Sequence, residues 1–363
     1  MAPVRLSGVE IAEADVAGFA RGCAVFGAGG GGAVGPSRFL VEQALRECGP
    51  TTVISVEQLP DEGVVMPLCM IGAPSVSLEK LSSGTEMDGV RAAVERYFGQ
   101  PVVAVMPSEI GGGNGVVPVG WAARAGLPLL DADCMGRAFP EVDMNIQNVV
   151  GRPQGPVVLG DERGNVVTAS ASDGPWAELI ARTVAEVFGA AALMADCLMT
   201  VADVPGAVVE GSVSKALALG RAIHEADEAV PGLIAAAGAV RLLTGKVVDV
   251  ERRTAGGFVR GSVLVEGYGE DQGRLARIEI QNENLVFLED GQVRACVPDL
   301  ITLVDTQTAD AVPNELVRYG QRVSVLAIGC DPLWRTERGL EVAGPRRFGY
   351  DFDYEPAAGL YGA

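Results

Sequence analysis

The 363-residue sequence has one histidine, His224, and no two cysteines in a CxxC spacing. Histidine-rich metal sites and thiolate zinc sites are therefore not indicated, and a Ser-His or Cys-His pair could use only that histidine. Because acidic residues surround it in a helical pattern, we interpret His224 as a solvated helix residue. The seven cysteines are scattered, so they indicate no disulfide framework and favour a reducing compartment.

Basic residues, aromatic residues and long apolar runs are also scarce. The net charge of -19 repels phosphate backbones, so we expect no nucleic-acid partner. The longest apolar-rich stretches, Val184–Met199 and Ala229–Leu243, are broken by charge, glycine or proline, which predicts no membrane span. Residues 1–25 lack the basic start and continuous apolar core of a secretory signal, so the expected location is the cytoplasm.

The remaining pattern predicts two domains, which the length allows. In the first half, short β-rich runs alternate with helical segments, as in an α/β architecture. Helices are predicted over Ala177–Leu198 and Val213–Ala229. From about residue 245, short strands follow one another with turn residues between them, which is typical of a mainly β unit. The sequence thus predicts an α/β N-terminal domain over residues 1–170, then a helical bridge and a mainly β C-terminal domain over 171–363.

A glycine run, Gly27–Gly32, lies between a short apolar run and a predicted helix. It satisfies G-x-G-x-x-G, and Glu57 follows a second strand near where a ribose-binding acid would lie. Such matches arise easily here, because 48 residues are glycine. Dinucleotide binding and a purely structural turn are the alternatives to a general ligand-facing loop. The predicted substrate contacts in this loop are Gly29, Gly30, Gly31 and Gly32.

A second glycine-rich segment, Pro107–Asn114, directly follows the predicted strand Val102–Met106. Ligand crevices form at strand ends in open α/β sheets. Glu109 would supply an acid/base group beside backbone that a ligand can approach closely. The alternative is a turn in which Asn114 caps the next helix. The predicted substrate contacts here are Gly112, Gly113 and Asn114.

The densest polar cluster begins at Asp131 and ends at Glu141. Asp131 and Asp133 would point to the same side of an extended segment. Arg137 could hold a substrate carboxylate through a two-pronged contact. We therefore predict substrate contacts from Asp131, Arg137 and Glu141 and an acid/base role for Asp133.

Two cysteines are candidate nucleophiles. Cys134 lies inside the polar cluster and could react if Arg137 or a helix start stabilises its thiolate. The neighbouring Asp133 opposes this by raising the thiol pKa, and a buried, inert cysteine is the alternative. Cys330, in an arginine- and aromatic-rich C-terminal segment, is the second choice.

Taken in order, these segments resemble the S-methyl thiohydantoin desulfurase family. The resemblance spans nearly the whole chain, and Gly136–Glu141 is its most specific string. It implies an α/β domain, a β-rich domain and a substrate site in the cleft between them. It also implies release of methanethiol from an S-methylated thiohydantoin to leave a hydantoin, as in ergothioneine catabolism. The matching segments are Gly27–Gly32, Glu109–Asn114, Asp131–Glu141, Trp334–Thr336 and Gly344–Asp351.

The mechanism expected from this resemblance is addition–elimination at the amidine-like ring carbon. Cys134 would attack, while Asp133 or Glu109 moves protons. The expected partner is a small cyclic substrate with no cofactor, and a homo-oligomer is left open. One alternative is Mg²⁺ or Mn²⁺ held by Asp131, Asp133 and Glu141, which would activate water for hydrolytic ring chemistry. Another is a non-catalytic partner of a hydantoinase.

Overall fold

The computed structural model describes residues 8–361 except 73–75, 77–79, 81 and 256–257. Its first sheet has nine strands, and the four central ones run parallel in the order β2-β5-β4-β3. Antiparallel strands extend this core on both sides. Across the sheet lie β1 (Val9–Ile11), β2 (Thr51–Ile54), β5 (Leu129–Leu130), β4 (Val102–Pro107), β3 (Val64–Gly72), β9 (Ala191–Ala195), β7 (Val157–Gly160) and β8 (Val166–Ala169), and β10 (Met199–Thr200) also pairs with β3.

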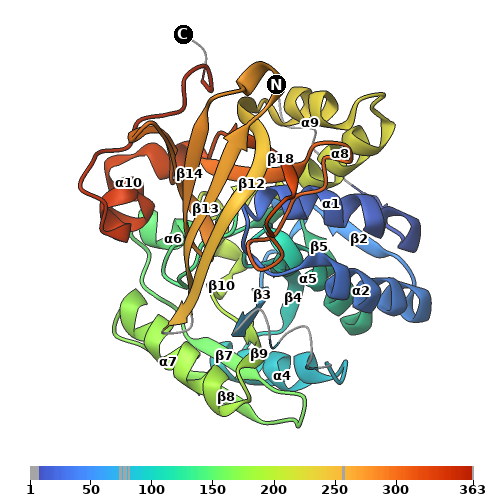
Figure 1. Ribbon diagram of the computed structural model, residues 1–363. Coiled ribbons are helices and arrows are strands. Elements are labelled where there is room, and N and C mark those ends of the chain that lie inside the picture. Colours follow the sequence, from blue (N-terminus) through green and yellow to red (C-terminus); the bar gives the residue numbers. More distant parts are fainter. Residues whose placement is uncertain (1–7, 73–75, 77–79, 81, 256–257, 362–363) are drawn as a thin grey trace.

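Helices cover both faces of this sheet (Figure 1). Strand β3 is therefore apolar on both sides: Met66 and Leu68 pack into the core beneath α1, α2, α4 and α5, while Cys69 and Ile71 pack toward α7. A strand buried on both faces reads as a continuous apolar run rather than an alternating one. The helices are α1 (Val16–Phe26), α2 (Val34–Cys48), α4 (Glu86–Phe98), α5 (Gly112–Ala125), α6 (Ile146–Val149), α7 (Gly174–Val187), α8 (Ser212–Glu225), α9 (Ala229–Ala237) and α10 (Glu337–Ala343).

The second sheet has seven antiparallel strands and curls into a half-barrel across the α/β part (Figure 1). Asn284 Nδ2 in β15 donates to the Ile301 carbonyl in β17 at 2.8 Å, which links two strands from opposite halves of the sheet. The order is β16 (Gln292–Cys296), β15 (Glu283–Glu289), β14 (Leu275–Gln281), β13 (Phe258–Gly267), β12 (Val240–Ala255), β18 (Arg322–Ile328) and β17 (Leu300–Asp305); a separate pair joins β6 (Ala132–Asp133) to β11 (Val209–Glu210). The predicted fold class is confirmed.

One apolar core joins the two parts. It contains Met106 and Leu130 from the first sheet, Leu285 and Leu300 from the second, and Trp334 near the C-terminus. The loop after α1 is bonded to the second sheet, because Ala28 O accepts from Asn284 N and Gly29 O accepts from Asn314 N, both at 2.8 Å. The junction is therefore an apolar, hydrogen-bonded interface, and segments from both sheets meet there.

The predicted helix over Ala177–Leu198 is wrong in its second half. Helix α7 ends at Val187, and Gly189 and Ala190, both with positive φ, turn the chain into β9. Periodicity cannot separate a short, fully buried strand from a buried helix, and every residue of β9 is buried. Strands β9 and β10 follow residue 170 and still pair with β3, so the domain boundary at that residue stays a prediction.

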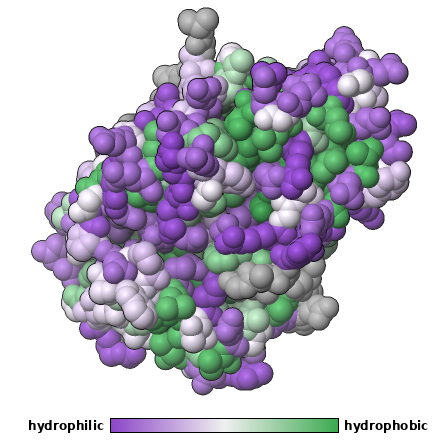
Figure 2. Space-filling model, turned by 60° about the vertical axis from the view of Figure 1, so that its left-hand side comes forward, coloured by the Kyte–Doolittle hydropathy of each residue, from purple (hydrophilic) through white to green (hydrophobic). Residues whose placement is uncertain are grey.

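Several large apolar side chains are exposed on the surface, among them Phe39, Trp176 and Val187. On the face in Figure 2, green residues form separate patches among hydrophilic ones. Within the described residues, no helix is both long and apolar enough to cross a bilayer. Most large apolar side chains are instead buried in the cores.

Glycine permits a very close contact between α1 and α8. A Cβ on Gly220 would lie 1.8 Å from Gly18 O, so Gly220→Ala must push two backbones apart. We expect a loss of about 3 kcal/mol or more and a fall in Tm of roughly 4 °C or more, because a long chain unfolds with a large entropy. Gly35→Ala is the control, because Gly35 lies in α2 with no atom within 4 Å of its added Cβ. Calorimetry should show a change within about 1 kcal/mol for that control; equal melting of the two variants would contradict the close contact.

Candidate active site

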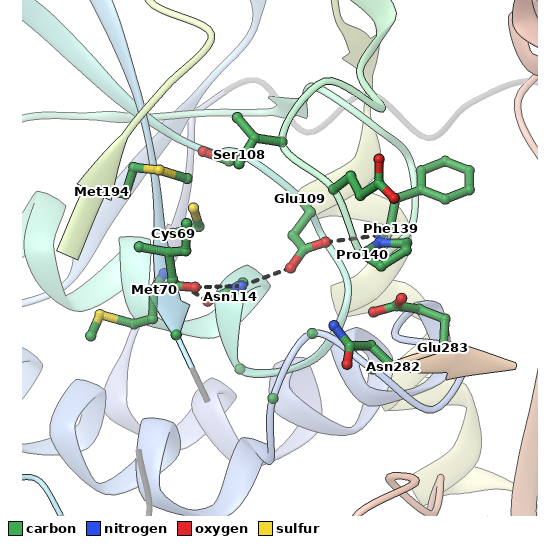
Figure 3. Close-up of a pocket in the computed structure, with 18 of the residues that line it drawn as sticks. Cys69, Met70, Ser108, Glu109, Asn114, Phe139, Pro140, Met194, Asn282 and Glu283 are labelled. Carbon is green, nitrogen blue, oxygen red and sulfur yellow. Dashed lines mark hydrogen bonds between the residues drawn. The ribbon is translucent and has the colours of Figure 1, made fainter. Parts of the chain in front are cut away.

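A pocket lies where the two sheets meet, beside the carboxyl ends of β3 and β4. Ligand sites in open α/β sheets favour this edge. Its walls come from the glycine loop after α1, the start of α5, the loop after β6, strand β9 and the turn between β14 and β15. Figure 3 shows ten of the lining residues by name, with Glu109 near the middle of the view.

Glu109 is a buried acid held by two hydrogen bonds. Its Oε1 accepts from Asn114 Nδ2 at 2.7 Å, and its Oε2 accepts from Phe139 N at 3.1 Å (Figure 3). Both bonds favour the charged carboxylate, yet burial raises the pKa of Glu109 to about 8. At neutral pH this carboxyl therefore carries a proton that it can donate.

Asn114 fixes the direction in which Glu109 points. Its Oδ1 accepts from Met70 N at 2.8 Å and its Nδ2 donates to Met70 O at 3.3 Å, so the second Nδ2 hydrogen is the one that binds Glu109. Helix α5 has Gly111 at its N-cap, so the alternative that Asn114 caps this helix is wrong. Asn114 also lines the pocket, as does the backbone of the strand to which it is bonded.

Glu283 is a second buried acid, at the start of β15. Figure 3 shows its side chain reaching into the pocket from the side opposite Cys69, toward Glu109. Burial, and then the charge of Glu109, raise the pKa of Glu283 well above its usual range. Two such neighbouring carboxyls do not both ionise readily, so the pair keeps at least one proton at neutral pH.

Close contacts require glycine at positions in the loop after α1. A Cβ on Gly30 would lie 1.9 Å from Glu283 Oε1, and one on Gly31 would lie 2.3 Å from Gly111 O. The carbonyls of Gly31 and Gly32 accept from the backbone N–H groups of Asn114 and Gly113 at 3.1 and 2.8 Å. The loop therefore caps the start of α5 with carbonyl oxygens and admits Glu283 beside it.

The structure brings about half of the predicted site residues to the pocket. Those that line it are Gly30, Gly31, Gly32, Glu109, Gly113, Asn114 and Glu141. Those that lie outside its lining are Gly29, Gly112, Asp131, Asp133, Cys134, Arg137 and Cys330.

Asp133 joins two loops. Its Oδ2 accepts from the backbone N–H groups of Ile110, Met135 and Gly136 at 2.9, 3.2 and 2.7 Å, and burial raises its pKa to about 6. It thereby holds together the loop that carries Glu109 and the loop that carries Phe139.

Both predicted nucleophiles are buried thiols outside the pocket lining. Cys134 is fully buried, and burial raises its pKa. Burial also raises the pKa of Cys330 to about 12, and Cys330 N donates to Asp299 Oδ1 and Tyr361 Oη at 3.2 and 3.1 Å. In this structure neither sulfur belongs to the pocket wall.

Arg137 is fully buried and tied to protein groups. Its Nη1 donates to the carbonyls of Pro298 and Asp299 at 2.7 and 2.9 Å, and its guanidinium lies 4.5 Å from the centre of the Phe139 ring. Burial lowers its pKa to about 10. Arg137 thus joins the pocket loop to the second sheet, behind the Phe139 ring that lines the pocket.

The three carboxylates of the metal alternative have separate partners. Asp131 accepts from Ser214 N at 2.9 Å, Asp133 accepts the backbone donors above, and Glu141 pairs with Arg347. Among the described residues, no three His, Cys, Asp or Glu side chains are placed to share a metal ion.

Among the pocket residues that the sequence did not predict are the polar residues Asp196, Asn282 and Glu283 and the thiol of Cys69. Ser108 Oγ donates to Asp196 Oδ1, and burial raises the pKa of Asp196 to about 6. Asn282 and Glu283 belong to an Asn-Glu-Asn string that reads as turn chemistry. Asn282 has a positive φ of 56°, which is uncommon for a residue other than glycine. Composition alone does not reveal this backbone conformation.

Two family models match the chain: the S-Me-THD-like N-terminal domain over residues 14–171 and the S-Me-THD-like C-terminal domain over residues 172–357. No curated protein matches the sequence. The fold is similar to that in an X-ray crystal structure of a protein from Chromobacterium violaceum, with a TM-score of 0.82 and 23% identity, covering 96% of this chain and 99% of that chain. At that identity the likeness shows the fold alone.

Burial of Glu109 predicts a pH-dependent stability. Its folded pKa of about 8 lies above the ordinary 4.5, so the folded state binds its proton more tightly than the unfolded state. The free energy of unfolding should therefore fall as pH rises from about 4.5 to 8, by up to about 1.4 kcal/mol per unit. Glu109→Gln should flatten that fall, measured by urea unfolding from pH 5 to 8. Glu186→Gln, an exposed acid in α7, is the control; an unchanged slope in Glu109→Gln would contradict the assignment.

Proposed function

The chain belongs to the S-Me-THD-like family, that of S-methyl thiohydantoin desulfurase, and on this premise we propose that it hydrolyses an S-methylated thiohydantoin to a hydantoin and methanethiol. The observation that carries the proposal is the buried pair Glu109 and Glu283 at the pocket between the two sheets. Such a pair can hold a proton donor and a proton acceptor in one dry site.

The reaction needs one water and two proton transfers. Water adds to the ring carbon that carries the methylthio group and is doubly bonded to a ring nitrogen. The carbon–sulfur bond then breaks, and the water oxygen becomes the hydantoin carbonyl. One water proton ends on the ring nitrogen and the other on the departing sulfur, so no cofactor is consumed.

The two carboxyls divide these transfers. Glu109, protonated at neutral pH, donates to the departing sulfur. Glu283, whose raised pKa keeps it protonated, accepts a proton from the attacking water on one oxygen and gives its own proton to the ring nitrogen from the other. Each well-placed proton-transfer group is worth about 10²–10⁴ in rate.

Water is favoured over a thiol as the nucleophile. Cys69 is the cysteine in the pocket lining, and burial, Asp196 and Glu109 all raise the pKa of its thiol. A thiolate is the reactive form, so this acidic surrounding suppresses it. Attack by Cys134, expected from the sequence, is the second mechanism; it requires that buried sulfur to reach the pocket.

Turnover of an S-methyl thiohydantoin separates these mechanisms. The parent should release methanethiol, measured with a thiol reagent, and hydantoin, measured by mass spectrometry. Glu109→Gln and Glu283→Gln should each lower kcat by about 10²–10⁴. Cys134→Ser should stay within tenfold of the parent, and Cys69→Ala, which keeps the pocket wall apolar, should lower kcat by less than tenfold. Loss of turnover in either cysteine variant, with Glu186→Gln active, would instead identify a covalent route.

The pH dependence of kcat should also report the protonation state of Glu109. Because the protonated carboxyl is the donor, kcat should fall as pH rises through about 8. The sign follows from the raised pKa: the active form is lost at high pH. A kcat that is constant from pH 6 to 10, in a protein that stays folded over that range, would exclude Glu109 as the acid.

A further inference from the structure

The pocket has an apolar side that the proton-transfer scheme does not use. Cys69 on β3 and Met194 on β9 are direct partners across the two strands, so their side chains lie on the same face of the sheet. Both are buried, at 6% and 2% exposure. With Ile71 and Val142 they belong to the apolar core packed against α7, and all four also line the pocket.

The opposite side is polar. It is formed by Asn282 in the turn between β14 and β15 and by Glu283 at the start of β15, with Asn314 and Glu315 nearby. In Figure 3, Cys69 and Met194 appear on one side of Glu109, and Asn282 and Glu283 on the other. Glu283 Oε2 is buried and has no hydrogen-bond partner among the described residues, so it can accept a bond from a ligand N–H.

A small ring with one S-alkyl group and an N–H edge fits these two sides in one orientation. Each buried methyl or methylene gains about 0.8 kcal/mol on the apolar side. A ring N–H turned to that side would lose its partner, at a cost of about 1–3 kcal/mol. Glu109 lies between the two sides, where its proton can reach the sulfur at their boundary.

We propose that Cys69, Ile71, Val142 and Met194 form an alkylthio subsite that receives the S-alkyl group of the substrate and limits its size, while Glu283 binds the ring N–H edge. This inference rests on the proposed function and assigns the orientation of the substrate. Met194 has the longest side chain of the four and lies beside Cys69 across the two strands, so shortening it should enlarge the alkylthio subsite.

The test compares S-methyl, S-ethyl and S-propyl thiohydantoins. The parent should favour S-methyl, and Met194→Ala should raise the kcat/KM ratio of S-propyl to S-methyl by at least about tenfold, the effect of one to two methylenes in a fitted pocket. Val142→Ala is a milder second variant if Met194→Ala does not fold. Met66→Ala is the matched control, because Met66 is a buried methionine of β3 on the other face of the sheet; it should leave the ratio unchanged.

Binding, measured by calorimetry with the same three compounds, separates failure of the subsite from failure of the reaction. Turnover with an unchanged ratio in both Met194→Ala and Val142→Ala would overturn the subsite but keep the proposed function. An affinity ratio that shifts without any turnover would support the subsite and overturn the reaction. Absence of both binding and turnover in the folded parent would overturn both.

Discussion

Removal of Glu109 from water is the constraint on which the site depends. Two hydrogen bonds favour its anion, yet desolvation outweighs them and raises its pKa to about 8, a shift worth roughly 5 kcal/mol. Glu283 reaches the same dry space from the second sheet and adds like charge. The junction between the sheets therefore creates the acid, because neither sheet alone encloses both carboxyls.

At that junction the backbones of two loops lie so close together that only glycine fits between them. Gly31 packs against Gly111, and Gly30 leaves room for the Glu283 carboxyl. Any side chain at these positions would hold the loops apart and admit water around Glu109. The G-x-G-x-x-G spacing here serves to join loops, and its carbonyls, rather than a ligand, bind the first N–H groups of α5.

The sequence predicted the fold class and Glu109, but only part of the site. The spacing of apolar residues and the turn residues between strands distinguish the α/β half from the β half. Glu109 could be predicted as a pocket residue because it directly follows a strand, where ligand crevices form. Glu283 lies 174 positions later, beside a turn whose composition is ordinary, and only the curling of the second sheet brings it to Glu109. Cys134 and Arg137 were singled out by local density, a measure that does not show which way a side chain points; both are fully buried behind the pocket.

The same electrostatics also constrain what the pocket can bind. Five acids line it, Glu109, Glu141, Asp196, Glu283 and Glu315, against one arginine, Arg182. Arg137, the residue expected to hold a substrate anion, instead bonds the carbonyls of Pro298 and Asp299. An anionic ring would meet those of these acids that are ionised, in a medium that screens charge poorly. In the proposed reaction, S-alkylation has removed the proton through which a thiohydantoin ionises at sulfur, so the alkylated ring would enter neutral. The protein would then supply a proton to a thiolate only after the carbon–sulfur bond breaks.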